Sequence, residues 1–194
     1  YNEAHDVHSA LTIKEVKNLS EQDKIFILNS FFDANYNNMI CIHPRYKELY
    51  QKRHSVGGNT KDFSEQEYSD ILMWFNLAWF DPSWRKINPE LNAFYVKEEG
   101  YTLEDRIRVI ELQRELIRDI IPAYKERFEQ GKIEITTSPY YHNILPLIID
   151  NDCKKLGNGI ETLPRNHFAH PEDAMTQIQK SIKKFRSTRK LRKF

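Results

Sequence analysis

The chain has 194 residues, of which 40% are hydrophobic and 29% charged, which is typical of one soluble globular domain or of a piece of a larger one. Six glycines and eight prolines are too few for a collagen-like or linker-dominated chain. Its apolar runs are short, as in Ile144–Ile149, whereas a membrane-spanning helix needs roughly 20 apolar residues. We therefore expect a folded protein without a membrane partner.

The formal net charge of +1 conceals an uneven distribution along the chain. Residues 180–194 contain eight Lys or Arg and no acid, so the preceding residues hold 21 bases against 28 acids and carry a charge of −7. A basic tail can neutralise phosphates, but this one lacks the interleaved aromatic residues on which single-stranded nucleic acids stack. We interpret it as a solvated helix end and expect no nucleic-acid partner; a salt-sensitive nucleic-acid binder is the alternative.

The cysteines and the first residues of the chain indicate its cellular location and whether it is part of a longer protein. Cys41 and Cys153 form no pattern typical of a disulfide framework, so a reducing, cytoplasmic location is the expectation. No segment typical of a secretory signal opens the chain. Because the first residue is Tyr1 and the first methionine is Met39, we expect an internal fragment of a longer protein.

Helix signals dominate the first part of the chain. Ser20 is a typical N-cap, and apolar residues follow it at the helical period. Pro44 opens a second, short helix, because proline is accommodated in a first turn. A capping box at 64–67 begins a helix over 68–80 that is apolar on nearly all sides and should be buried, until Asp81-Pro82 stops it.

The second part contains a long helix and two later ones. Thr102 caps the long helix, Gly131 suits its left-handed C-cap, and Pro122 should kink or split it. A short helix is predicted near 144–150, and the last helix starts at Pro171. Apolar residues line one face of the long helix (Leu103, Ile107, Ile110, Ile117, Ile121, Tyr124, Phe128) and of the last (Ala174, Ile178, Ile182, Phe185).

One strand is predicted, over residues 133–137, which alternate with period two and are rich in β-branched side chains. A single strand needs partners for its backbone groups. They are either weaker strands of this chain or lie outside it.

Polar and aromatic residues follow the predicted strand. Glu134 would face away from the strand's isoleucines, and a carboxylate on an apolar strand is costly to bury without a partner or a purpose. Ser138, two tyrosines and His142 come next, where α/β barrels build their active sites. The alternative is an exposed edge strand with Glu134 in water and the tyrosines in the core.

Two further groups of residues are candidate sites. Trp74, Trp79 and Trp84 could bind an apolar ligand or a sugar ring, although helical spacing favours a core role. Trp84, beyond the helix stop, is predicted to be the exposed one. The pairs His5/His8 and His167/His170 could bring imidazoles together, but no cysteines accompany them. We expect no metal site and no cofactor, and interpret His170 as a helix entrance.

Three segments are informative when taken together: Trp74–Pro82, Gly131–His142 with Leu145-Pro146-Leu147, and His170–Ala174 with Gln177 and Ile178. Their sequences, order and spacing resemble those of glycoside hydrolase family 57 of the α-amylase and amylopullulanase type. The resemblance spans about Lys24 to Phe185.

The resemblance implies part of an incomplete seven-stranded β/α barrel, to which this mostly helical fragment contributes one or two strands. It implies a retaining mechanism on α-glucans, in which a Glu nucleophile and an Asp general acid lie roughly 5 Å apart. Both belong to family motifs expected downstream of Phe194, so the chain holds no catalytic residue of its own. By the same resemblance Glu134 lines the sugar-binding cleft, with Tyr141 and His142 at its rim and the Trp79–Asp81 corner beside it.

The chain departs from the family at Asn143, where a proline is usual, and after Phe185, where 186–194 form a basic tail unlike the family's approach to its nucleophile. We therefore predict that 1–194 is a partial catalytic domain, inactive alone. A free-standing helical module that binds oligosaccharide without cleaving it is the alternative. A severed barrel strand would expose unpaired edges and favour self-association.

Overall fold

The computed structural model describes residues 6–156 and 166–190. Within these ranges the chain is mostly helical, as predicted, and contains no strand. Its contacts divide it into unit 1, Tyr1–Ile120, and unit 2, Ile121–Phe194, and each is described by itself. The described residues form no β/α barrel, so the expected barrel contribution is not seen.

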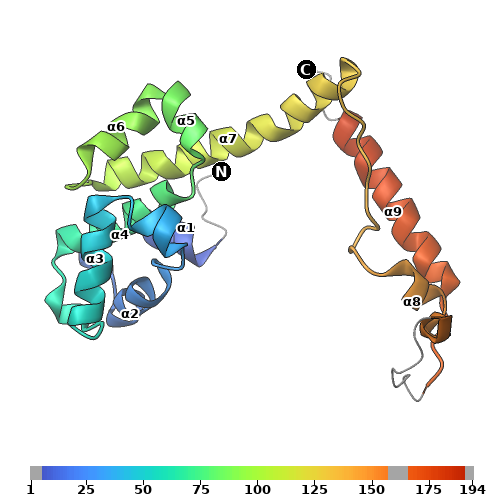
Figure 1. The fold of residues 1–194 in the computed structure, drawn as a ribbon, viewed down its shortest axis with the longest axis horizontal. Helices are drawn as coiled ribbons and strands as arrows, with labels where there is room; N and C mark the ends of the chain where they lie inside the picture. Colours follow the sequence, from blue (N-terminus) through green and yellow to red (C-terminus); the bar gives the residue numbers. More distant parts are fainter. Residues whose placement is uncertain (1–5, 157–165, 191–194) are drawn as a thin grey trace. The chain divides into compact units, whose positions relative to one another are not determined.

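Unit 1 is built from short helices and helical turns joined by tight loops (Figure 1). In chain order these are α1 (Val7–Thr12), η1 (Val16–Asn18), α2 (Glu21–Ser30), η2 (Tyr36–Ile40), α3 (Pro44–Ser55), η3 (Thr60–Asp62), α4 (Glu65–Ala78), α5 (Pro82–Ile87), α6 (Pro89–Lys97) and the first part of α7 (Leu103–Glu129).

The helix starts predicted at Ser20 and at Ser64 are confirmed by capping boxes. The backbone N–H of Asp23 donates to Ser20 Oγ at 3.1 Å, and the Asp23 carboxylate accepts from the Ser20 N–H at 2.9 Å. Ser64 and Glu67 make the same reciprocal pair at the start of α4. These bonds satisfy backbone donors that a helix leaves open at its N-terminus.

Helix α4 forms the centre of the core, as its apolar composition predicted. Trp74 is 1% exposed, and its indole N–H donates to the Glu98 carbonyl at 2.8 Å. Buried side chains from the surrounding helices and loops pack with α4 into one cluster, which includes Ile27, Leu28, Phe31, Tyr46, Leu49, Leu91, Tyr101 and Val109.

A buried carboxylate joins the loop before α7 to this core. Asp70 accepts from the backbone N–H groups of Gly100 at 3.0 Å and Tyr101 at 3.2 Å. Arg45 Nη2 lies 2.9 Å from the other carboxylate oxygen. A buried charge is tolerated when it is paired and hydrogen-bonded in this way.

Helix α7 ends as predicted but is not split. Gly131 has φ +67°, the left-handed conformation that favours glycine. The N–H of Lys132 donates to the Arg127 carbonyl at 2.9 Å, the bond expected of a Schellman C-cap. Pro122 lies inside the continuous helix, so of the two expected outcomes, a kink or a split, the split does not occur.

Unit 2 contains the end of α7, α8 (Leu145–Ile149), η4 (Asn151–Leu156) and α9 (Pro171–Lys190). Helix α8 packs beside α9 (Figure 1). Backbone bonds from His170 to Ile148 at 2.8 Å and from Asn151 to Phe168 at 2.9 Å join the two segments.

The strand predicted over 133–137 is wrong for a physical reason. The segment that continues from it lies against α9: Tyr140 donates its N–H to the Gln177 carbonyl, and Ser181 Oγ donates to the Ser138 carbonyl at 2.6 Å. A helix uses its own backbone groups internally, so it cannot provide the ladder that a strand needs. The predicted alternation is seen only in side-chain exposure, because Ile133 and Ile135 are half-buried and their neighbours in the sequence are exposed.

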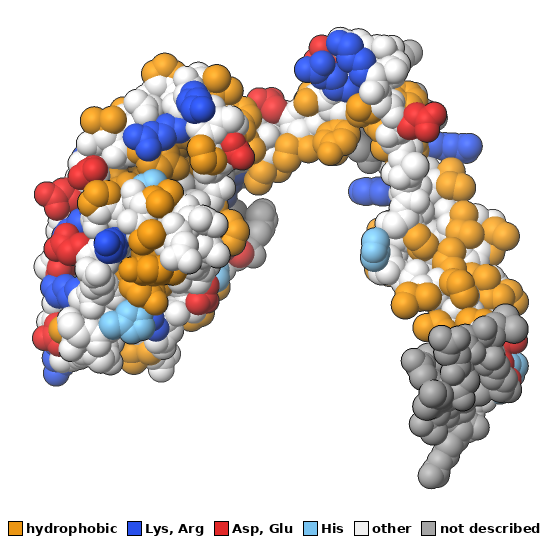
Figure 2. All heavy atoms as spheres, viewed as in Figure 1, with side chains coloured by type: hydrophobic (Ala, Val, Ile, Leu, Met, Phe, Trp, Pro, Cys, Tyr) orange, Lys and Arg blue, Asp and Glu red, His pale blue; other side chains and the backbone are white. Residues whose placement is uncertain are grey.

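The predicted apolar face of α9 is only partly buried. Ala174 and Ser181, which face the rest of unit 2, are buried, whereas Ile178 and Ile182 are exposed. Figure 2 shows hydrophobic side chains over the part of the surface that α8 and α9 form. Unit 2 therefore leaves apolar side chains in contact with solvent.

Candidate functional site

Two adjacent tyrosines are held on the surface of unit 2 by their contacts with α9. The Tyr141 N–H donates to Gln177 Oε1 at 3.1 Å, and the two rings meet edge to face with centroids 4.9 Å apart. Tyr141 is 71% exposed. The tyrosines are therefore surface residues, and the alternative that placed them in the core is wrong.

Lysines of α9 accompany the tyrosines. Lys180 Nζ lies 6.0 Å from the Tyr140 ring centroid and 5.9 Å from that of Tyr141, within range of a weak cation–π attraction. A hollow of about 320 Å³ is lined by Tyr140, Tyr141, Lys180, Lys183, Lys184 and Ser187. It combines the aromatic rings of Tyr140 and Tyr141 with hydrogen-bond donors from the lysines and Ser187.

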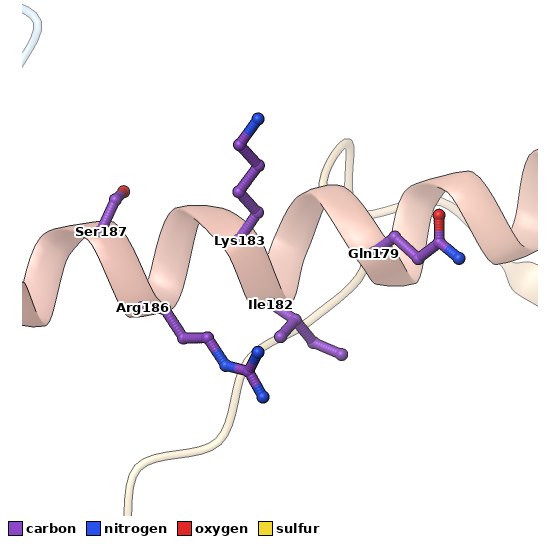
Figure 3. Close-up of a pocket in the computed structure, with 5 residues that line it drawn as sticks. All are labelled: Gln179, Ile182, Lys183, Arg186 and Ser187. Atoms are coloured by element: carbon purple, nitrogen blue, oxygen red, sulfur yellow. The ribbon is translucent and has the colours of Figure 1, made fainter.

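A second hollow, of about 550 Å³, lies along α9 and is lined by Gln179, Ile182, Lys183, Arg186 and Ser187 (Figure 3). In Figure 3 Lys183 and Ser187 project from one side of the helix, whereas Ile182 and Arg186 project from the other. Lys183 and Ser187 border both hollows, so the two form a connected basic surface.

The turn after the tyrosines has an unusual backbone. His142 has φ +56°, and its N–H donates to the Pro139 carbonyl at 2.8 Å. Histidine visits this left-handed region more readily than most residues. The side chain of His142 is exposed. The side chain of Glu134 is exposed as well, which agrees with the interpretation that placed Glu134 in water.

The aromatic corner of unit 1 differs from its prediction. Trp79, the C-cap residue of α4, is 59% exposed, whereas Trp84 is half-buried against the core. The prediction that Trp84 is the exposed tryptophan is therefore wrong. Proline at the start of α5 lets the chain continue as a helix, and this helix places Trp84 against the core.

Asp81 acts as the N-cap of α5. Its carboxylate accepts from the Ser83 N–H at 2.8 Å and from the Ser83 hydroxyl at 2.5 Å. These hydrogen bonds hold the pKa of Asp81 below its ordinary value. The side chain is thus a charged, exposed acceptor whose sugar-binding role is still a prediction.

The five predicted site residues therefore fall in both units. Trp79 and Asp81 belong to unit 1, and Glu134, Tyr141 and His142 to unit 2. The sequence did not predict that Lys180, Lys183 and Lys184 line the same hollow as Tyr141. Their helical spacing could have indicated a shared surface, but it was interpreted only as a solvated helix end.

A separate cluster of possible metal ligands lies near α8. Ligand atoms of Asp150, Asp152 and His167 all lie within 4.8 Å of one another. His167 Nε2 is 3.0 Å from Asp150 Oδ1. The spacing of His167 and His170 suggests that they lie together, but in the structure His170 Nδ1 contacts Glu172 Oε1 at 2.9 Å instead.

Comparison with known proteins gave one match. The family model for glycosyl hydrolase family 57 matches residues 5–189, nearly the whole chain. Neither the curated proteins nor the solved structures contained a match. Among the residues that the structure describes, no helix is long and apolar enough to cross a membrane.

Proposed function

The chain belongs to glycosyl hydrolase family 57, and we propose that it is part of an enzyme that cleaves or transfers the bonds of α-glucans. The family match over residues 5–189 carries this proposal. By resemblance the reaction is retaining and uses a Glu nucleophile and an Asp general acid. The motifs that hold these two carboxylates are not found within residues 1–194, so we propose that the chain alone binds glucan without cleaving it.

We propose that Tyr141 and the hollow beside it contact the sugar. An exposed aromatic face can stack against the apolar face of a glucose ring, and lysine ammonium groups can donate to its hydroxyls. Glu134 and His142, on the same exposed segment, would add an acceptor and a polar ring. Trp79 and Asp81 would form a further contact of the same kind, an exposed ring two residues from an exposed carboxylate.

Isothermal titration of the 194-residue chain with maltoheptaose tests the binding role. We expect measurable binding, and a loss of about tenfold or more in Tyr141→Ala, corresponding to ~1.5 kcal/mol for a lost aromatic contact. Tyr124→Ala is the matched control, because Tyr124 is also exposed but lies outside the hollow. Absence of heat with the unmodified chain would contradict the proposal, as would equal losses in both variants.

Incubation with maltooligosaccharides tests the second half of the proposal. We expect no product from the 194-residue chain, and turnover would show that it contains its own catalytic carboxylates. Sequencing the encoding DNA beyond Phe194 in all three frames separates a partial enzyme from a free-standing binding module. A Trp-Pro-Ser-Glu-like motif there supports the enzyme, and its absence supports the module.

We also propose that the chain self-associates and acts in the cytoplasm. The predicted reason for self-association, an unpaired strand edge, does not apply to the described residues. Exposed apolar side chains give a different reason, since Ile117, Ile121 and Tyr124 of α7 all face solvent. Sedimentation velocity should show association that weakens in Ile117→Lys, and a monomer at every concentration would contradict it.

A further inference from the structure

Three metal-ligating side chains from two separate segments meet at the start of η4. Asp150 and Asp152 come from the end of α8 and the beginning of η4, and His167 lies 15 residues further along the chain, before α9. The ligand atoms of all three lie within 4.8 Å of one another. None of the three belongs to the proposed sugar-binding surface.

The backbone holds these segments in place independently of the cluster. Asn151 bonds Phe168 twice: its N–H donates to the Phe168 carbonyl at 2.9 Å, and its Oδ1 accepts from the Phe168 N–H at 3.1 Å. Asn151 Nδ2 also donates to the Asn166 carbonyl at 3.2 Å. The ligands are thus carried by two short segments that are clamped together on either side of His167.

The side chains within the cluster are oriented as well. Asp150 Oδ1 accepts from the Asp152 N–H at 2.8 Å and lies 3.0 Å from His167 Nε2. Zinc binds imidazole nitrogen and carboxylate oxygen at about 2.0–2.2 Å, so two ligand atoms of one ion lie roughly 3–4 Å apart. The His167–Asp150 separation already has this size, and a small side-chain adjustment would bring in Asp152.

We propose that Asp150, Asp152 and His167 bind a Zn²⁺ ion. One imidazole and two carboxylates supply three ligands of the kind zinc accepts, and water completes the coordination. The ion would connect η4 to the segment that leads into α9, and would thereby stabilise unit 2, whose described residues include few buried apolar side chains. The proposal does not depend on glucan binding.

Titration of the metal-free 194-residue chain with Zn²⁺ tests this site, with Co²⁺ as a spectroscopic probe. We expect one Zn²⁺ per chain, visible d–d bands of a low-coordinate Co²⁺ site, and reversal by a chelator. His167→Ala and Asp152→Asn should each lower the affinity by roughly 100-fold or more, since each removes a direct ligand.

His170→Ala is the matched control, because His170 is an exposed histidine three residues away whose ring contacts Glu172 and is not part of the cluster. Its affinity should equal that of the unmodified chain. Circular dichroism confirms that each variant keeps its helices, and Asp152→Asn retains the size of the side chain. Equal affinities in all four proteins, or an equal loss in His170→Ala, would show that the cluster is only an ion pair and overturn the proposal.

Discussion

Unit 1 and unit 2 differ in how much apolar side chain they bury. The buried hydrophobic cluster of the described chain runs from Leu11 to Leu112, entirely within unit 1. In the described part of unit 2 the buried residues are Ala174 and Ser181. Burial of apolar surface is the main favourable term in folding, so unit 1 should be the stable part. Unit 2 is held chiefly by hydrogen bonds between its loops and α9, and it presents the exposed tyrosines and lysines.

The comparison predicts two unfolding transitions in urea. All three tryptophans lie in unit 1, so tryptophan fluorescence follows unit 1, whereas far-ultraviolet circular dichroism follows helices of both units. We expect part of the dichroism to be lost at lower urea than the fluorescence change. Coincident transitions would show that the two units unfold together.

The largest mutational effect is expected in the core of unit 1. Leu72 is completely buried in α4, so Leu72→Ala should lower the free energy of unfolding by about 3–4 kcal/mol through lost burial and a cavity. The fluorescence midpoint in urea measures it. Ile178→Ala, at an exposed position of α9, is the control and should leave that midpoint unchanged. A comparable loss in both would contradict the difference between the units.

Asp70→Ala should cost nearly as much, about 3 kcal/mol. It leaves the N–H groups of Gly100 and Tyr101 without their acceptor and the Arg45 guanidinium without its buried partner. The same fluorescence midpoint measures the loss. Glu48→Ala removes one of the two exposed partners of Arg45, Glu48 and Glu99, and should cost far less, so equal effects would show that burial of Asp70 is not what matters.

A smaller loss of stability is expected at the C-terminal end of α7. Gly131→Ala places a Cβ at φ +67°, and should destabilise the C-terminal turn of α7 by about 1 kcal/mol. Amide exchange of the last turn should quicken while tryptophan fluorescence is unchanged. Unaltered exchange there would mean that the left-handed cap contributes nothing.

The smallest effect concerns acid stability of unit 1. The hydrogen bond from Lys14 Nζ at 2.7 Å, together with bonds from Ser20, holds the pKa of Asp23 below its ordinary value of 3.8. A depressed folded-state pKa means that this stabilisation is present above pH 3.8 and is lost as the pH falls below it. The gap in urea midpoint between the unmodified chain and Asp23→Asn should therefore narrow in acid. A gap that does not change with pH would contradict the role of the charge.

Local chemistry made much of the fold predictable. Ser20, Ser64 and Gly131 mark helix boundaries through hydrogen bonds with near neighbours in the sequence, and all three predictions are confirmed. The strand over 133–137 failed because alternation records exposure, whereas a strand also requires a partner that only the tertiary fold can supply. The structure exposes Trp79 rather than Trp84 for a similar reason, since the burial of a side chain depends on which helices pack nearby.

The candidate sites were less predictable because they join distant residues. Tyr141 meets Lys180 only because 137–141 lies along α9, and no periodicity reveals that contact. The sequence pattern does not single out Asp150 and Asp152, and it pairs His167 only with its neighbour His170. Spacing rules detect ligands on one element, whereas these ligands come from two segments.

Hydrogen–deuterium exchange of the 194-residue chain with and without maltoheptaose tests the central claim most directly. If unit 2 presents the glucan-binding surface, the sugar should slow exchange in peptides that cover 138–142 and 179–187, while the α4 core of unit 1 stays unchanged. Protection that is absent from both peptides at saturating maltoheptaose would contradict the account.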